Sequence, residues 1–405
     1  MICIDPLKVQ TVIPVSTPFA RPILALGVET KNAMALGQGS AINLFSSGGN
    51  LADPVARTLM EQRVKTLLNH RDHPVEVLVV DLHPDLYPTV LGRRLAQELN
   101  LTLVAVQHHQ AHGAACMAEH NLHEALALTF DGMGYGSDGM LWGAELLYLT
   151  KKSWSRLGSF MPVPLLGGDA AVCHPVRQLF ARLLTAGVAI TPAWQERLGL
   201  SSAQIEIWSR QCRLGIHAPK SHAAGRLFDA FAAWLGSAPG VIAHEGEPAM
   251  GLEGVAQSWR GDQKSRKLSF ALRENQGVLW VDWSPLFAAL SVDPVPVAEW
   301  ASWAYAFHVA VAEAMVEMVQ QGCRKTGLST VVLSGGVFLN GLLKRLLLDR
   351  LQALSVRVYD HQRLPSGDGN IAVGQLLVAQ ERDDSSCVWQ FPCSLSPSMQ
   401  TIPAL

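Results

Sequence analysis

Short apolar segments alternate with amphipathic ones along the first third of the chain, in an order typical of an α/β unit. Apolar runs of four to six residues indicate strands, and apolar residues spaced three and four apart indicate helices. The expected elements are strands at 23–27, within the glycine-punctuated stretch 33–49, at 75–80 and at 101–106, with helices at 54–68, 89–99 and 110–120. Because the run 75–80 is apolar except for Glu76, we expect it to lie centrally in its sheet, covered on both faces.

The rest of the chain repeats this pattern around a long insertion. Strands are expected at 126–130, 140–149, 157–161, 330–333 and 356–359, and helices at 339–354 and 371–382. The insertion, roughly 173–321, contains many leucines and tryptophans and is expected to be mainly helical. Two ββαβα-like halves predict the two-lobed architecture of actin, Hsp70 and the sugar kinases, built from duplicated RNase H-like lobes, in which a nucleotide binds between the lobes.

The pattern also predicts where the parts of the chain begin and end. We expect an N-terminal extension over 1–21, a first lobe over 22–123, a second lobe with its insertion over 124–384, and a loose tail rich in serine and proline over 385–405.

Composition excludes several classes of protein. Charged residues make up 16% of the 405 residues, apolar ones 49%, and the net charge is −2, so the chain carries no broad basic field for nucleic acid. The sequence shows neither an apolar run of about 20 residues nor a signal-peptide pattern, which argues against a membrane protein. Seven cysteines without a CxxC pair indicate a reduced, cytoplasmic protein.

The histidine run at 106–112 is the strongest sign of chemistry. His108 and His112 are four residues apart, so a helix would place both imidazoles on one face, about 6 Å apart. Asp131 ends an apolar strand and could supply a third ligand. Two imidazoles and a carboxylate suit zinc or ferrous iron with open positions for substrate. The alternative is a solvated histidine cluster at a helix start.

Two glycine-rich turns follow predicted strands nearer the C-terminus. Gly335 and Gly336 come between a strand and a helix, where a backbone without side chains can approach a phosphate and the helix N-terminus favours its charge. Asp368 lies in a second such turn and could cap the next helix or bind a metal ion. Each turn taken alone is more often a plain connection.

Together and in this order, these segments resemble the C-terminal domain of the HypF-type hydrogenase maturation carbamoyltransferases. The resemblance runs from about residue 22 to about 380 and extends more thinly to the tRNA threonylcarbamoyltransferases and antibiotic O-carbamoyltransferases. The matching stretches are ILALGVETKN at 23–32, DLHPD at 81–85, VQHHQAH at 106–112, FDGMGYG at 130–136 with DG at 138–139, GGDAA at 167–171, GRLFD at 225–229, LSGGVF at 333–338 and SGDG at 366–369. Gln110 stands where the family often has a further histidine.

The resemblance implies a set of site residues. The metal ligands would be His108, His112, Asp131 and Asp368, with the ion, zinc or ferrous iron, in the cleft between the lobes. The nucleotide, ATP or carbamoyl-AMP, would be met by Gly167, Gly168, Asp169, Gly225, Arg226, Asp229, Gly335, Gly336 and Asn340. Lys31 and Arg226 are candidate catalytic groups, and Glu245 is a candidate carbamoyl or ribose contact. The simpler interpretations are that Asp169 closes a turn, that Arg226 and Asp229 form a helix-face pair, and that Lys31 is an ordinary turn residue.

The implied reaction is transfer of a carbamoyl group from carbamoyl-AMP to the C-terminal cysteine of a HypE-type acceptor protein, for cyanide ligand synthesis in [NiFe]-hydrogenase maturation. The acylphosphatase, zinc and YrdC-like adenylating modules of full-length relatives have no counterpart in this chain. We therefore expect a truncated form that depends on a separate YrdC-like protein or on a full-length HypF for its donor. The alternatives are a tRNA threonylcarbamoyl- or small-molecule O-carbamoyltransferase, an ATPase or kinase of the same fold, and a non-catalytic scaffold.

Overall fold

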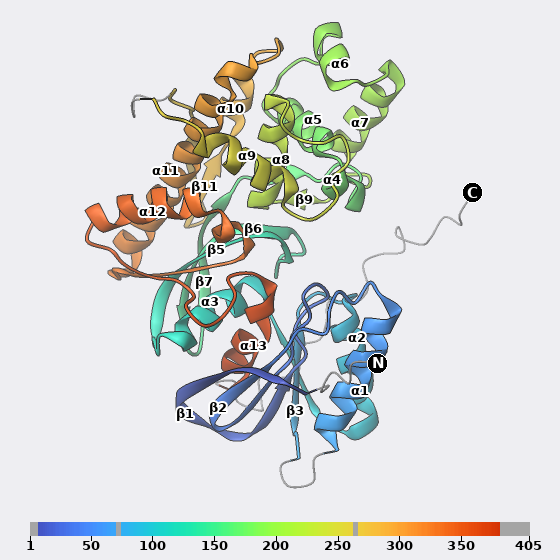
Figure 1. Ribbon diagram of the computed structural model, residues 1–405, viewed down its shortest axis with the longest axis vertical. Helices are drawn as coiled ribbons and strands as arrows, with labels where there is room; N and C mark the ends of the chain where they lie inside the picture. The colour runs from blue at the N-terminus through green and yellow to red at the C-terminus, as the bar shows by residue number, and fades with distance from the viewer. Residues whose placement is uncertain (1–6, 70–73, 262–265, 381–405) are drawn as a thin grey trace. The chain divides into compact units, whose positions relative to one another are not determined.

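The structure is a computed structural model that describes residues 7–69, 74–261 and 266–380 (Figure 1). The expected tail at 385–405 lies outside these described residues. The chain folds into two compact units, each packed mainly within itself. Unit 1 combines the residues up to Gln107 with the helix that follows Asn370, and unit 2 runs from His108 to Asn370.

Unit 1 is a four-stranded sheet with helices against it. The strand order is β2-β1-β3-β4, where β1 (Val9–Ala25) is antiparallel to β2 (Ala35–Phe45) and parallel to β3 (Val77–Asp81), which is parallel to β4 (Thr102–Val106). Helix α1 spans Pro54–Leu68, and helix α2 (Tyr87–Leu99) packs on β3 and β4. All five residues of β3 are buried, as expected for a central strand.

The first strand begins far earlier than its apolar run. The strand expected at 23–27 is the end of β1, which starts at Val9, inside the segment expected to be an extension. Residues 9–22 are mostly exposed and do not alternate regularly, so their pattern carried no strand signal. Pairing with β2 across the hairpin, with register shifts between Pro14 and Ile23, holds this part of the strand in place.

Helix α13 (Ile371–Gln380) packs across all four strands of unit 1. The sequence assigned this segment to the second lobe, and it assigned helix α3 (His108–Glu119) to the first. In the structure α3 contacts β5, β6 and β12 of unit 2. Gln375 shows why α13 belongs with unit 1: its buried side chain accepts a hydrogen bond from the backbone N–H of Gly27 at 3.0 Å. Apolar periodicity reports that a helix is buried, but not which sheet it covers.

Unit 2 is built on a larger sheet in the order β10-β11-β7-β6-β5-β12-β13. The strands are β5 (Glu124–Tyr135), β6 (Leu141–Thr150), β7 (Trp154–Phe160), β10 (Ala271–Asn275), β11 (Val278–Asp282), β12 (Thr330–Ser334) and β13 (Arg357–Tyr359), with the short β8 (Val163–Pro164) and β9 (Lys220–Ser221) paired beside them. Strands β5, β6 and β7 are antiparallel, and β12 runs parallel to β5. The β10–β11 hairpin was not expected, although its turn at Gln276 and Gly277, both with positive φ, carries a hairpin signal.

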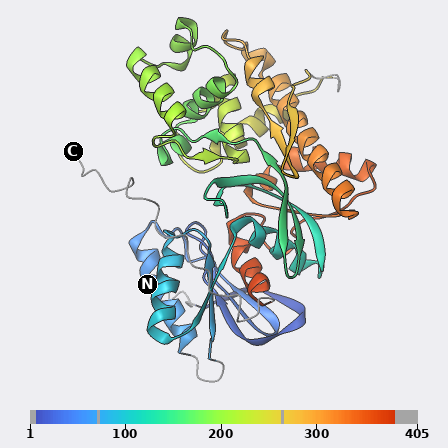
Figure 2. The ribbon, with the colours of Figure 1, turned by 180° about the vertical axis from the view of Figure 1, so that it is seen from behind.

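The insertion is mainly helical, as its composition predicts. Its helices are α4 (Asp169–Cys173), α5 (Pro175–Thr185), α6 (Pro192–Leu198), α7 (Ser202–Leu214), α8 (Ala224–Leu235), α9 (Glu247–Gln257), α10 (Ser284–Ala288) and α11 (Trp300–Thr326), and α12 (Gly341–Ala353) follows β12. The long α11 packs against α9 and α12 and against strands β5 to β7 (Figures 1 and 2). The ring of Phe231 on α8 stacks on that of Phe307 on α11 at a centroid distance of 4.2 Å. Among the described residues, none of the helices combines the length and the apolar character needed to cross a bilayer.

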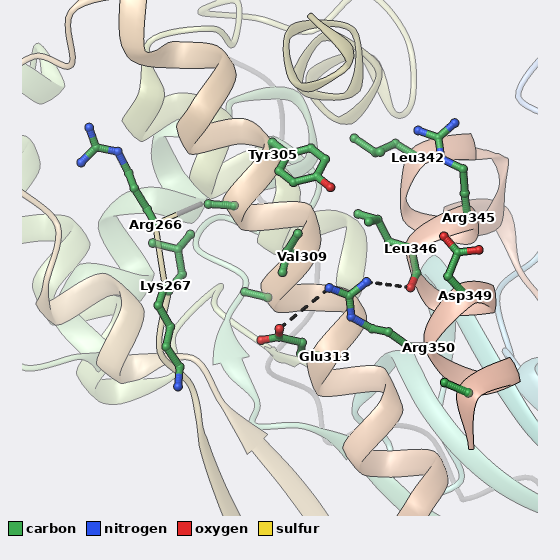
Figure 3. Close-up of a pocket in the computed structure, with 14 residues that line it drawn as sticks. Arg266, Lys267, Tyr305, Val309, Glu313, Leu342, Arg345, Leu346, Asp349 and Arg350 are labelled. Atoms are coloured by element: carbon green, nitrogen blue, oxygen red, sulfur yellow. Dashed lines mark hydrogen bonds and ion pairs between the residues drawn. The ribbon is translucent and has the colours of Figure 1, made fainter. Parts of the chain in front are cut away.

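A cavity of about 830 Å³ opens between α11 and α12 (Figure 3). Its floor is apolar, with Val309 from α11 and Leu346 from α12. Cations and anions share its rim, and Arg350 donates to the Leu346 carbonyl at 3.0 Å and lies 3.9 Å from the Glu313 carboxylate. None of the residues that the sequence assigned to the site lines this cavity.

Candidate metal centre

Four side chains of unit 2 converge as the sequence and the resemblance predict. His108, His112, Asp131 and Asp368 each offer a ligand atom, and these atoms all lie within 4.8 Å of one another. The Asp131 Oδ2 atom lies 3.4 Å from His108 Nε2 and 3.6 Å from His112 Nε2. The Asp368 Oδ1 atom lies 3.8 Å and 3.7 Å from the same two nitrogens. The Asp368 side chain is 21% exposed and the other three are nearly buried, so the cluster opens to solvent on the side of Asp368.

Local structure explains how the two histidines come together. They lie one turn apart on α3, with ring centroids separated by 4.9 Å. Gly134 on β5 makes room for them, because a Cβ there would lie 2.6 Å from the His108 ring. The register of β5 against β6 shifts between Phe130 and Gly134, and such an irregularity re-aims the side chains of a strand. Asp131 falls within this shift, at the place where its carboxylate meets the histidines.

The glycine turn after β12 holds Asp131 in position. The N–H of Gly336 donates to Asp131 Oδ1 at 2.9 Å, which leaves Oδ2 for the histidines. Gly335 has a φ of 107°, and a Cβ on it would meet the Phe130 carbonyl oxygen at 2.1 Å, so no other residue fits there. The Gly335 N–H donates to the carbonyl of Ser366, in the loop that carries Asp368. The turn that the sequence assigned to a phosphate thus ties together two members of the cluster.

Asn370 orients His112 and was not assigned a role from the sequence. Its side-chain nitrogen donates to the carbonyls of Pro365 at 2.9 Å and Ser366 at 3.2 Å, so its Oδ1 faces His112 Nδ1 at 3.1 Å as an acceptor. His112 therefore carries its proton on Nδ1 and presents the lone pair of Nε2 to the cluster. This Nε2 atom is buried and has no hydrogen-bond partner.

The charges of the cluster favour a cation. Burial alone would raise the pKa of Asp131, but the imidazoles of His108 and His112 beside its carboxylate hold it well below its usual range. Burial lowers the pKa of His112, and the carboxylates of Asp131 and Asp368 outweigh this effect, so the pKa is raised. Two imidazole nitrogens, one of them the orphaned Nε2 of His112, and two carboxylate oxygens fit a divalent transition metal ion as ligands.

A further hydrogen-bonded chain runs outward from this shell. The hydroxyl of Ser334 lies 3.3 Å from His112 Nδ1 and 2.9 Å from His361 Nε2. His361 Nδ1 lies 3.1 Å from the carboxylate of Glu119, which also accepts the Gln362 N–H at 2.9 Å. The residue types are those of a nucleophilic triad, but Ser334 is completely buried and cannot meet a substrate. The hydrogen bonds from Glu119 through His361 and Ser334 instead hold the side chain of His112 in place. No spacing in the sequence indicated this contribution.

His109 is fully buried beside the cluster, with its ring centroid 6.0 Å from that of Trp142. Burial, followed by the charges of its histidine neighbours, holds its pKa well below the usual value. Its position is that of a packing residue beside the two histidines of the cluster.

Helix α8 begins against the cluster. Gly225 lies in its first turn, where a Cβ would lie 3.5 Å from the Cα of Gly132, the residue after Asp131. Glu245 approaches the same glycine, because a Cβ on Gly132 would lie 2.8 Å from the Glu245 carboxylate. Arg226 and Asp229 are both buried on α8, with Nε and Oδ2 at 2.7 Å, and so form the helix-face pair that was the simpler interpretation.

The remaining predicted residues lie in turns or caps. Asn340 caps α12 through a hydrogen bond from Leu343 N–H at 2.9 Å, and its side-chain nitrogen donates to His308 Nε2. Two glycines with positive φ, Gly167 at 89° and Gly168 at 57°, precede the exposed Asp169 at the start of α4. Lys31 is exposed in unit 1, in the turn between β1 and β2, with a φ of 48°. Contacts of these residues with a nucleotide stay a prediction.

Comparison with known proteins gives the class and then the family. The family model described as "HypF Kae1-like domain" matches residues 19–119, and "Carbamoyltransferase, Kae1-like Domain, second subdomain" matches residues 127–375. The fold and the site thus define a Kae1-like carbamoyltransferase, an enzyme of the actin and sugar-kinase type of fold, which confirms the predicted fold class. More narrowly, the chain belongs to the HypF family.

Two relatives that differ in length support the assignment to this family. The carbamoyltransferase HypF homolog of Cupriavidus necator is 35% identical over 379 residues, which are 92% of this chain and 94% of that protein. Carbamoyltransferase HypF of Rhodobacter capsulatus is 32% identical over 91% of this chain but only 48% of its own length. The chain therefore spans nearly all of the first relative and about half of the second.

Two solved structures agree. Full-length HypF in the phosphate- and nucleotide-bound form is 26% identical, with a TM-score of 0.82 over 92% of this chain and 57% of that one. HypF of T. kodakarensis is 27% identical, with a TM-score of 0.79 over 92% of this chain and 49% of that one.

Proposed function

We propose that this chain transfers a carbamoyl group from carbamoyl-AMP to the C-terminal cysteine of a HypE-type acceptor protein, for the cyanide ligands of a [NiFe]-hydrogenase. The observation that carries the proposal is the cluster of His108, His112, Asp131 and Asp368, preassembled in a chain of the HypF family. The thiolate of the acceptor attacks the carbamoyl carbon, a C–S bond forms, the C–O bond to the phosphate breaks, and AMP leaves.

The four clustered side chains would hold the metal ion, zinc or ferrous iron, because imidazole nitrogens suit these ions better than they suit magnesium. When bound, such an ion offsets phosphate charge and polarises an acyl or phosphoryl oxygen. The chain supplies the fixed frame: the Gly336 N–H orients Asp131, and Asn370 orients His112. A preorganised frame of this kind lowers the barrier without reorganising during the reaction.

The nucleotide would reach the cluster on its solvent side, next to Asp368. Gly132 follows Asp131 in the chain, and the first turn of α8 at Gly225 and the side chain of Glu245 both approach Gly132. Glycines let a ligand approach the backbone closely, and Glu245 can accept a hydrogen bond from a ribose hydroxyl or a carbamoyl N–H group.

An external nucleophile agrees with the cysteines of this chain. None of the cysteines in the described part of the chain belongs to the cluster. Cys116 is buried, and burial raises the pKa of its thiol far above the usual value. Burial likewise raises the pKa of Cys212 to about 11. Neither thiol would be a thiolate at neutral pH, and a reduced cytoplasmic setting suits both.

We further propose that the carbamoyl-AMP comes from a separate YrdC-like adenylating protein or from a full-length HypF. The test is a transfer assay on the purified chain with a HypE-type acceptor, ATP and carbamoyl phosphate, with and without an added YrdC-like domain. The acceptor cysteine is scored by mass spectrometry. We expect a carbamoyl adduct only with the added domain.

Two controls make the assay decisive. The Asp131→Asn variant keeps the shape of the side chain but loses the ligand charge, so it should give no adduct. An adduct without the added domain would contradict the separate donor. No adduct under either condition would favour phosphoryl transfer or transfer to another acceptor.

A further inference from the structure

A second cavity of unit 2, of about 260 Å³, lies between the ends of β7 and β11 and the helices α5 and α10. Trp283 and Phe287 give it aromatic walls, and its polar groups are Arg182, Thr185, Arg273, Asp282 and Ser284. No residue of the metal cluster lines it. A volume of this size suits a ligand smaller than a nucleotide.

The only carboxylate among the residues that line this cavity is already neutralised. Asp282 Oδ2 lies 2.9 Å from Arg273 Nε and 2.8 Å from Arg273 Nη2. Its other oxygen accepts the N–H of Ser284 at 2.8 Å. Both oxygens of Asp282 therefore have partners, and the pair of Arg273 and Asp282 adds no net charge to the cavity.

Arg182 is in the opposite situation. The residue is only 5% exposed, and its Nε atom is buried without a hydrogen-bond partner. Among the described residues, its guanidinium forms no hydrogen bond and no ion pair within 4.0 Å. The carboxylate that acts on it electrostatically, that of Asp229, is paired with Arg226 at 2.7 Å. Burial lowers the pKa of Arg182 to about 9, so the group is still a cation at neutral pH.

A buried, unpaired guanidinium is costly unless something satisfies it. Two arginines and one aspartate share the interior of α5 and α8, which leaves one positive charge without an anion. The ring of Phe287, 5.7 Å from the Arg182 guanidinium carbon, offers a weak cation–π contact but no hydrogen-bond acceptor. A planar guanidinium fork matches the two oxygens of a carboxylate or phosphate group.

We propose that this cavity binds a small molecule that carries a carboxylate or phosphate group, with Arg182 as the anion-binding residue. The oxyanion accepts hydrogen bonds from the guanidinium, and a compact apolar part of the ligand packs on Trp283 and Phe287. The site is separate from the metal cluster in its residues and does not depend on the proposed carbamoyl transfer.

The test is isothermal titration calorimetry, in which the whole chain is titrated with benzoate and with inorganic phosphate at constant ionic strength. Benzamide serves as a neutral probe of the same shape as benzoate. We expect saturable binding of benzoate, of phosphate, or of both, and none of benzamide. The anion that binds tells a carboxylate site from a phosphate site. If neither anion shows saturable binding, the proposal is wrong.

Two variants on the same helix assign the binding to Arg182. Arg182→Met keeps the length of the side chain and removes the charge, so affinity should fall at least about tenfold, the effect of losing a charge-assisted pair. Arg177→Met is the matched control, since Arg177 also lies on α5, stacks on Trp208 and does not line the cavity. It should bind as the natural chain does. Equal affinity of the Arg182→Met variant would refute the assignment.

Thermal unfolding without ligand separates binding from a structural role. Because the substitution removes an unpaired buried charge, the thermal unfolding midpoint of the Arg182→Met variant should equal that of the natural chain or exceed it. A large fall would mean that Arg182 stabilises the fold through Asp229, against the proposal. Should Arg182→Met fail to fold, Arg182→Lys keeps the charge without the planar fork and should still bind the anion more weakly.

Discussion

The orientation of His112 by Asn370 leads to a quantitative prediction about metal affinity. The change is Asn370→Leu, which keeps a similar volume and removes both polar atoms of the amide. Asn370 is completely buried, and its Oδ1 is the acceptor 3.1 Å from His112 Nδ1. Without this acceptor, Ser334 is left as the polar partner of Nδ1, and it also serves His361.

The expected loss follows from the role of such partners. Removing a hydrogen-bonded group behind a metal-binding histidine typically costs 10- to 100-fold in affinity, or about 1.4 to 2.8 kcal/mol. The same change removes the donors to Pro365 and Ser366, in the loop that holds Asp368. At about 1 kcal/mol for each lost hydrogen bond, the free energy of unfolding should fall by roughly 2 to 3 kcal/mol.

Affinity and stability must be measured separately. Competition with a chromophoric chelator gives the dissociation constant for zinc, and urea unfolding of the metal-free protein gives stability. Gln375→Leu is the matched control, because Gln375 is another fully buried amide, bonded to Gly27 in unit 1. It should lose comparable stability and keep its zinc affinity. Equal zinc affinity in Asn370→Leu and the natural chain would refute the reasoning.

Three further predictions concern His112, Gly335 and His308. His112→Ala should abolish metal binding and leave the circular dichroism spectrum unchanged, and equal metal content in mutant and natural protein would contradict the assigned site. Gly335→Ala should unfold the protein at lower urea concentration and weaken metal binding, because the new Cβ meets the Phe130 carbonyl; an unchanged midpoint would show that the turn can shift. Burial lowers the pKa of His308 to about 4, against 6.5 for an exposed histidine, so between these values the unfolded chain binds the additional proton. Stability should therefore fall by about 2 kcal/mol from pH 7 to pH 5, and His308→Phe should remove that part of the pH dependence in urea titrations.

Local spacing was enough to predict the elements that carry the site. The helix expected at 54–68 coincides with α1, and the four-residue interval between His108 and His112 places both rings on one face of α3. These predictions succeed because periodicity within one element depends only on backbone geometry. Asp131 was expected at the end of a strand, but β5 continues to Tyr135, and the carboxylate reaches the histidines from a register shift within that strand.

Asp368 entered the predicted site through the resemblance to a family, since no local pattern joins it to a histidine more than 250 residues away. The residues behind the metal ligands, Glu119, His361 and Asn370, had no recognisable motif around them in the sequence. Only the packing of α3 against β12 brings them together.

Tertiary structure also decided which unit each segment joins. Residues 9–22 form part of β1 because β2 offers hydrogen bonds along its edge, and α13 covers the sheet of unit 1 although it follows the last strand of unit 2. The sequence by itself determined the type of each strongly periodic element and the helix face that carries two ligands. The sheet that an apolar surface covers, and the partners that a buried polar atom finds, depend on residues far along the chain, so only the folded structure determines them.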